Sequence, residues 1–227
     1  MSRSPIQALP IQAILWDIDG TLLDSEPWHQ RWTIDVCRRF GHAMSDSDYA
    51  NTLGIAFPDL YARLNAARPM DVTFREWADA ITDLYLERIA EVEERAGAFA
   101  LVEAFAARGL RQACVSNSGR RAVEGNLRRM GIPHFAFGIS RDDVTNGKPD
   151  PEPYLLAAER LGVAPEVCAV IEDSPTGARA AKAAGMLTVA WPQHPHLLFE
   201  AADHVVEDPA DLDWDALCGL AERMAAD

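Results

Sequence analysis

The feature that most constrains the fold is a regular alternation of short apolar runs with longer helical patterns. Four runs have the length and composition of buried strands: Gln12–Trp16, Gln112–Val115, Val167–Ile171 and Leu187–Ala190. A fifth, shorter strand is expected at His204–Val206. Strands that alternate with helices in this way belong to parallel sheets. The sequence therefore predicts an α/β protein built on a parallel sheet.

Three helices are predicted between these strands, and each ends at a glycine: Arg120–Met130, Pro151–Leu161 and Thr176–Ala184. Glycine is the usual residue just past a helix C-terminus. The last of the three follows Ser174 and Pro175, a polar cap and a proline at the first helical position. These signals give the helices defined ends.

The segment between the first two strands is different, because residues 25–96 contain helical patterns and no convincing strand. Helices are predicted at Pro27–Phe40 and at Thr73–Arg95, where apolar residues recur at helical spacing. A helical block after the first strand predicts a second, smaller domain. We expect a core of residues 1–24 and 97–227, with an inserted helical domain of residues 25–96.

Composition excludes several classes of protein. The chain has 21 basic and 35 acidic residues, a net charge of −14, and no stretch concentrates Lys and Arg as in a nucleic-acid footprint. No apolar run approaches a membrane span, and the N-terminal stretch lacks an apolar signal core. The four cysteines are widely spaced and expected to be buried reduced thiols. We expect a soluble cytoplasmic protein, and the sequence leaves its oligomeric state open.

Asp17 and Asp19 directly follow the first predicted strand. Two carboxylates two residues apart can face the same side, and Gly20 lets the chain turn away at little steric cost. One aspartate can serve as a nucleophile or a metal ligand, and the other can carry a proton to a leaving oxygen. The alternative is an aspartate-rich turn that closes the strand.

Ser116 and Asn117 follow the second strand, next to a helix start. A serine hydroxyl and exposed backbone N–H groups there can hold phosphate oxygens, although an ordinary helix cap gives the same pattern. Lys148 stands between Gly147 and Pro149 in a loop before a helix. It can supply the cation that an acidic protein needs for an anionic substrate, whereas a solvated surface lysine is the alternative.

Glu172 and Asp173 follow the third strand and offer hard oxygen ligands. With Asp17 and the backbone carbonyl of Asp19 they can complete an octahedral site. An all-oxygen set without His or Cys favours Mg²⁺ over zinc or copper, and helix capping by Asp173 is compatible with it. Because ligands gather outside the carboxyl ends of parallel strands, all these residues are expected to converge there.

Together the four motifs resemble those of the haloacid dehalogenase (HAD) superfamily, and within it the branch of β-phosphoglucomutase-like and sugar-phosphate phosphatases. The segments that carry the resemblance are Asp17–Ser25, Ser116–Asn117, Gly147–Pro151 and Glu172–Ser174. The resemblance covers nearly the whole chain. It implies a Rossmann-like core with an α-helical cap domain inserted after the first motif.

The resemblance also implies a reaction in two steps. Asp17 would attack phosphorus and form an aspartyl-phosphate. Asp19 would protonate the leaving oxygen and then activate water. Ser116, the backbone of Asn117 and Lys148 would bind the phosphoryl group. The implied activity is the hydrolysis of a small phosphorylated metabolite, most simply a sugar or polyol phosphate.

Mg²⁺ is the cofactor that the resemblance implies. Asp17, Asp19 and Asp173 would hold it, with Glu172 as a further candidate ligand. Its charge would offset the repulsion between the attacking carboxylate and the phosphate.

The main alternative is a sugar phosphomutase, whose cap is expected to carry a basic residue beside a glycine and an arginine shortly after it. Here Leu53 and Phe57 stand at those places around Gly54, which favours a hydrolase. His29 stands where the mutases have a cap histidine used in gating, and a plain polar helix residue is its alternative. His29, Gly54 and Phe57 are therefore candidate cap residues. A metal-free dehalogenase and an inactive binding protein are disfavoured by the acids, Ser116 and Lys148.

Overall fold

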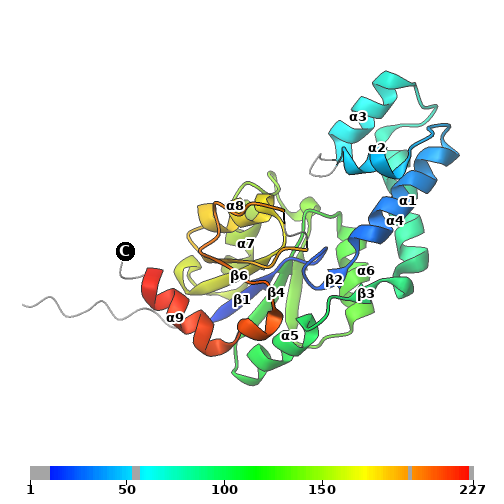
Figure 1. Ribbon diagram of the computed structural model, residues 1–227. Helices are drawn as coiled ribbons and strands as arrows, with labels where there is room; N and C mark the ends of the chain where they lie inside the picture. The colour runs from blue at the N-terminus through cyan, green and yellow to red at the C-terminus, as the bar shows by residue number, and fades with distance from the viewer. Residues whose placement is uncertain (1–10, 53–56, 194–195, 225–227) are drawn as a thin grey trace, which may run out of the picture. The chain divides into compact units, whose positions relative to one another are not determined.

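The computed structural model describes residues 11–52, 57–193 and 196–224 (Figure 1). The chain divides into two compact units. The first is formed by the described residues up to Asp24 and from Glu94 onward, and the second is Ser25–Glu93. The second crossing between the units thus lies between Glu93 and Glu94, slightly earlier than the 95–98 expected from the sequence.

A six-stranded sheet forms the centre of the first unit, in the order β5-β4-β1-β6-β7-β8. Each neighbouring pair is parallel, which confirms the predicted α/β fold. The strands are β1 (Ala13–Trp16), β4 (Arg111–Val115), β5 (Phe135–Ile139), β6 (Cys168–Glu172), β7 (Leu187–Ala190) and β8 (His204–Val205). β1 lies between β4 and β6, so the segments that follow these three strands begin side by side.

Helices cover both faces of this sheet, which is why its central strands can be apolar on both sides. All four residues of β1 and all five of β6 are buried. In Figure 1, α7 and α8 lie on one face and α5 and α9 on the other. The helices of this unit are α5 (Ala98–Ala107), α6 (Arg120–Met130), α7 (Glu152–Leu161), α8 (Pro175–Ala183) and α9 (Trp214–Met224).

One strand of the six-stranded sheet was not predicted from the sequence, β5 at its edge. Its residues are mostly half-exposed, and it contains Gly138, whose missing side chain leaves room for Val123 of α6. A Cβ at Gly138 would lie 2.7 Å from that valine. A short edge strand with a glycine carries a weak sequence signal, because its pairing and packing decide its structure.

The predicted helix Thr73–Arg95 was too long. α4 spans Phe74–Arg88, and a 3₁₀ turn at Ile89–Glu91 follows it. The chain then forms β3 (Glu93–Glu94), which pairs with β2 (Leu23–Asp24) in a separate two-stranded sheet. Helical periodicity cannot report this pairing, because the partner strand lies far away in the sequence.

The second unit consists of helices in its described part: α1 (Glu26–Arg39), α2 (Asp46–Ala50), α3 (Phe57–Ala67) and α4. Thr73 begins α4 with a capping box, in which its hydroxyl accepts from the Glu76 N–H and the Glu76 carboxylate accepts from the Thr73 N–H. α1 packs on α4 through aromatic rings, with Trp32 edge-on to Tyr85 at 5.3 Å. The second unit therefore has an apolar interior formed by its own helices.

The cysteines are all free thiols. Cys37, Cys114 and Cys168 are buried as predicted, whereas Cys218 is only half-buried because it lies on the surface helix α9. No helix in the described part of the chain is long and apolar enough to cross a membrane.

Candidate active site

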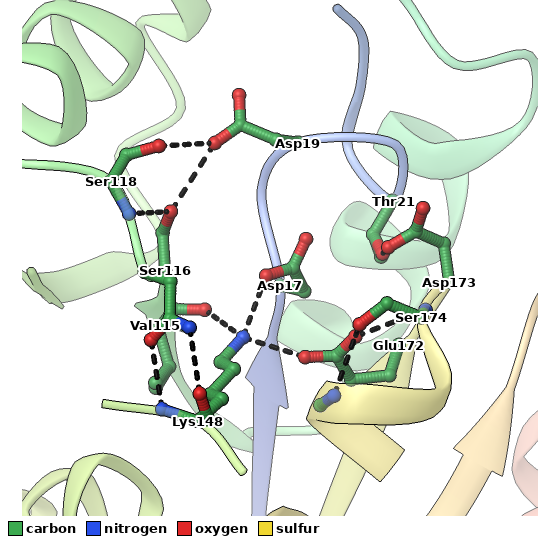
Figure 2. Close-up of polar contacts among 12 residues, drawn as sticks. Asp17, Asp19, Thr21, Val115, Ser116, Ser118, Lys148, Glu172, Asp173 and Ser174 are labelled. Atoms are coloured by element: carbon green, nitrogen blue, oxygen red, sulfur yellow. Dashed lines mark hydrogen bonds and ion pairs between the residues drawn. The ribbon is translucent and has the colours of Figure 1, made fainter. Parts of the chain in front are cut away.

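The predicted residues of the core meet at the carboxyl ends of the neighbouring strands β1, β4 and β6. Asp17 follows β1, Ser116 follows β4, and Glu172 is the last residue of β6. Figure 2 shows these residues around Lys148, which reaches in from the loop before α7. The convergence expected at the carboxyl ends of the strands is thus observed.

Lys148 is the centre of this group. Its Nζ lies 2.6 Å from Asp17 Oδ1, 2.6 Å from Glu172 Oε1 and 2.7 Å from the carbonyl oxygen of Val115. Only 8% of the residue is exposed, so the solvated-surface alternative is wrong. Burial alone would lower the pKa of Lys148, but the charges of Asp17 and Glu172 outweigh it and raise that pKa above its usual value. The lysine is therefore a permanent cation, and all three of its N–H groups are engaged.

Three acids, Asp17, Glu172 and Asp173, form the cluster beside Lys148. One carboxylate oxygen of each lies within 4.8 Å of the others. Burial raises the pKa of Asp17 well above its usual value, with Lys148 opposing. Burial and then the neighbouring Glu172 raise the pKa of Asp173 to about 8, against the opposing charges of Lys148 and Arg95. Burial therefore favours the neutral forms of Asp17 and Asp173, against the attraction of the chain's own cations.

Glu172 is fully buried, and both of its oxygens accept hydrogen bonds. Oε1 accepts from Lys148 and from the hydroxyl of Tyr154, which lies 2.7 Å away on α7. Oε2 accepts from the hydroxyl of Ser174 at 3.0 Å. Tyr154 was not identified from the sequence, because an aromatic residue within a helix looks like an ordinary core residue. The network holds Glu172 and Lys148 in one arrangement.

Gly177 of α8 makes room for the Glu172 carboxylate. A Cβ at this position would lie 1.7 Å from Glu172 Oε1. Alanine normally stabilises a helix relative to glycine by about 1 kcal/mol. We expect Gly177→Ala to lower the free energy of unfolding instead, by about 1–3 kcal/mol, because the carboxylate must move.

Gly219→Ala in α9 is the matched control, since its Cβ would make an ordinary 3.5 Å contact with Arg223. This variant should be neutral or up to about 1 kcal/mol more stable than the wild type. Urea unfolding of both variants tests the prediction. Equal stabilisation by the two alanines would contradict the packing argument.

Asp19 has a different environment from Asp17. Its Oδ2 accepts hydrogen bonds from the hydroxyls of Ser116 at 3.2 Å and Ser118 at 2.9 Å, and Figure 2 shows both. The Ser118 N–H also donates to Ser116 Oγ at 3.0 Å. The carboxylate of Asp19 is not part of the three-acid cluster. No role was predicted for Ser118, although a second hydroxyl two residues after Ser116 is visible in the sequence.

The side chain of Asn117 holds the backbone of Lys148. Its Oδ1 accepts from the Lys148 N–H at 2.8 Å, and its Nδ2 donates to the Lys148 carbonyl at 3.0 Å. The amide thus pairs with the lysine loop as a neighbouring strand would. Only the backbone N–H of Asn117 is left for the predicted phosphate contact.

The predicted cap residues lie in the second unit or outside the described residues. His29 lies on α1, and its ring stacks on Tyr85 at 5.0 Å between centroids. Phe57 is the first residue of α3, is 37% exposed, and contacts Trp77 edge-on at 5.5 Å. Gly54 lies outside the described residues. The roles of these three residues remain predictions.

A buried lysine and three acids thus meet at the carboxyl ends of parallel strands in an α/β sheet. A family model described as haloacid dehalogenase-like hydrolase matches residues 11–185, and the chain belongs to this family. The chain is therefore an enzyme, of the phosphatase class within the family.

Individual relatives agree with this assignment. Fructose-1-phosphate phosphatase YqaB of Escherichia coli is 32% identical, over 76% of this chain and 92% of the relative. Hexitol phosphatase A of Escherichia coli is 30% identical, over 79% and 82%. The crystal structure of CbbY from Rhodobacter sphaeroides in complex with phosphate superposes with a TM-score of 0.82, at 29% identity over 89% of this chain and 96% of CbbY.

Proposed function

We propose that the chain is a magnesium-dependent phosphatase that hydrolyses a small phosphate monoester through a phosphoryl group bound to Asp17. The observation that carries this proposal is the pairing of Asp17 with Lys148 at 2.6 Å, beside the buried Glu172 and the half-buried Asp173. A carboxylate held by a fixed cation at a strand end is suited to attack on an anionic phosphate.

The donor set at this edge fits a magnesium ion. Asp17 and Asp173 offer carboxylate oxygens, and burial raises the pKa of both, so a bound cation would favour their charged forms. Glu172 is the weaker candidate ligand, because both its oxygens already accept hydrogen bonds. Asp19 would contribute its backbone carbonyl. When bound there, magnesium would offset the repulsion between Asp17 and the phosphate.

The chain's own residues then divide the reaction between them. A carboxylate oxygen of Asp17 forms a bond to phosphorus while the bond from phosphorus to the leaving oxygen breaks. Asp19 gives its proton to that oxygen, and it later takes a proton from the water whose oxygen bonds to phosphorus as the bond from phosphorus to Asp17 breaks. Ser116, the Asn117 N–H and Lys148 hold the phosphoryl oxygens. Because the three Lys148 donors are all engaged, a phosphoryl oxygen must share or displace one of their acceptors.

We propose a sugar or polyol monophosphate as the substrate and the cytoplasm as the site of action. The names of the relatives, a fructose-1-phosphate phosphatase and a hexitol phosphatase, support this substrate class. A sugar phosphomutase uses the same chemistry at phosphorus and is the alternative. The relatives' phosphatase names favour hydrolysis.

The decisive experiment is an assay of the purified protein against a panel of sugar and polyol phosphates. We expect release of inorganic phosphate with Mg²⁺ and its loss with EDTA. A main product that is an isomeric sugar phosphate would assign the mutase instead. Undiminished turnover after metal removal would contradict the proposed magnesium dependence.

Lys148→Ala should lower kcat by roughly 10²–10³-fold, the usual effect of deleting one preorganised charge-stabilising donor. Lys148→Arg should rescue poorly, because a planar fork cannot replace a point charge that faces three acceptors. Lys182, the other lysine of the chain, supplies the control. It is paired with Asp203 near the surface, and its replacement by alanine should leave kcat unchanged. Full activity of Lys148→Ala would remove the residue from the reaction.

A further inference from the structure

Arg95 is a second cation near the acidic cluster, and no motif in the sequence marks it. It follows β3 and belongs to the same unit as the sheet. Its Nη1 donates to the carbonyls of Gly20 and Trp191, both at 2.6 Å, and its Nη2 donates to the carbonyl of Pro192 at 2.8 Å. The guanidinium also lies 3.8 Å from the centroid of the Trp191 ring. One side chain thus joins the turn after β1 to the segment after β7.

The turn that Arg95 contacts is the one that carries both catalytic aspartates. Gly20 has a φ of +88°, and its N–H donates to the carbonyl of Leu23 at 2.8 Å. The backbone N–H of Arg95 donates to the carbonyl of Leu22, also within this turn, at 2.9 Å. Arg95 therefore fixes the turn at two carbonyls, one through its side chain and one through its backbone.

The turn that Arg95 holds also lies against Asp173. Gly20 leaves so little room that a Cβ there would lie 2.2 Å from Asp173 Oδ2. The hydroxyl of Thr21 lies 3.5 Å from the other oxygen, Oδ1. The positive charge of Arg95 attracts Asp173, in the direction that opposes the burial of this carboxylate. A shift of the turn would consequently change the distance between Asp17 and Asp173.

We infer that Arg95 is a positioning residue for the reaction: it holds the turn after β1 in the conformation that places Asp17 and Asp173 together. This inference rests on the proposed function for its effect on turnover. The geometry requires arginine, because three acceptors lie around one planar group that also stacks on an indole. A lysine at this position keeps the charge, but its compact ammonium cannot match this arrangement.

Arg95→Lys tests the inference, and Arg111→Lys is its matched control. Arg111 also donates to two backbone carbonyls, of Leu161 at 2.7 Å and Gly162 at 3.2 Å, but it lies at the amino end of β4, away from the carboxyl ends that carry the acids. We expect Arg95→Lys to lower kcat by roughly 10–100-fold and to weaken Mg²⁺ binding in isothermal titration about tenfold. KM for the phosphate ester should change little. Arg111→Lys should change none of these.

Amide hydrogen exchange gives a readout that does not depend on activity. Residues 18–24 should exchange faster in Arg95→Lys than in the wild type, while the strand 111–115 should exchange equally in both. A kcat within twofold of wild type, or unchanged exchange of the turn, would overturn the inference. Should the wild type prove inactive towards phosphate esters, the proposed function fails, whereas exchange and Mg²⁺ titration still decide the role of Arg95.

A second variant keeps the test open if Arg95→Lys does not fold. Trp191→Leu removes the ring on which the guanidinium stacks and leaves the carbonyl acceptors in place. We expect the same changes at a smaller size, with faster exchange of residues 18–24 and a kcat several-fold lower. The effect is smaller because a single cation–π contact has modest strength. No change in either quantity would contradict the proposed bracing of the turn.

Discussion

Asp17→Asn is expected to abolish turnover, with a loss on the order of a million-fold in kcat, as for deleted nucleophiles in other hydrolases. An amide oxygen is too weak a nucleophile to attack phosphorus. The same change also removes one of the two best candidate metal ligands. The fold should persist, because asparagine has the same size and can still accept the hydrogen bond from Lys148. Steady-state assays with a sugar phosphate, together with a thermal melt, measure both expectations.

Asp203→Asn is the matched control. Asp203 is paired with Lys182 and accepts from the Thr188 N–H at 2.9 Å, outside the cluster of acids. It should retain wild-type kcat. Activity of Asp17→Asn within tenfold of the wild type would exclude a phosphoryl intermediate on this residue. If Asp17→Asn lost its cooperative melt, unfolding would explain its loss of activity. Trapping a covalent phosphoryl group on the wild-type enzyme would then decide whether Asp17 carries the intermediate.

The residues at the ends of central strands could be predicted from the sequence for a physical reason. β1 and β6 are buried on both sides, so each reads as an apolar run that ends in acids. The carboxyl ends of adjacent parallel strands must meet, and this places Asp17 near Glu172 although their separation in sequence is large. The prediction that these side chains converge therefore needs only the parallel pairing of the strands, and no knowledge of side-chain packing.

The residues that support the site could not be predicted in the same way. Tyr154 and Arg95 act through single long-range contacts, a hydroxyl on Glu172 and a guanidinium on backbone carbonyls. Before the fold is known, a helical tyrosine reads as core and an isolated arginine reads as surface. β3 was assigned to a helix for a related reason, because its pairing with β2 depends on a distant segment.

Asp19 is the residue whose role depends most on its local environment. Its carboxylate is held by the hydroxyls of Ser116 and Ser118 and lies apart from the three-acid cluster. A carboxylate outside that cluster is available for proton transfer. Asparagine at this position can keep both hydroxyl contacts through its remaining oxygen, so Asp19→Asn removes the proton and leaves the geometry. The variant thus separates acid–base chemistry from positioning.

We expect Asp19→Asn to slow the attack of Asp17 on a sugar phosphate by roughly 10²–10⁴-fold, the usual contribution of a positioned acid. The alkoxide that leaves a sugar needs a proton, whereas a nitrophenolate does not. The first step with p-nitrophenyl phosphate should therefore be slowed far less. Release of the phosphoryl group should stay slow with both esters, because in the proposed mechanism the same carboxylate activates the water.

Rapid mixing with the nitrophenyl ester measures the two steps separately. Asp19→Asn should give a fast burst of nitrophenol, at most equal to the enzyme concentration, followed by slow turnover as phosphoenzyme accumulates. Ser118→Ala removes one contact to Asp19 but keeps its proton, and it should show a milder loss without the dependence on leaving group. An equal slowing of the first step for both esters in Asp19→Asn would mean that another group protonates the leaving oxygen, since only an acid in that step distinguishes an alkoxide from a nitrophenolate.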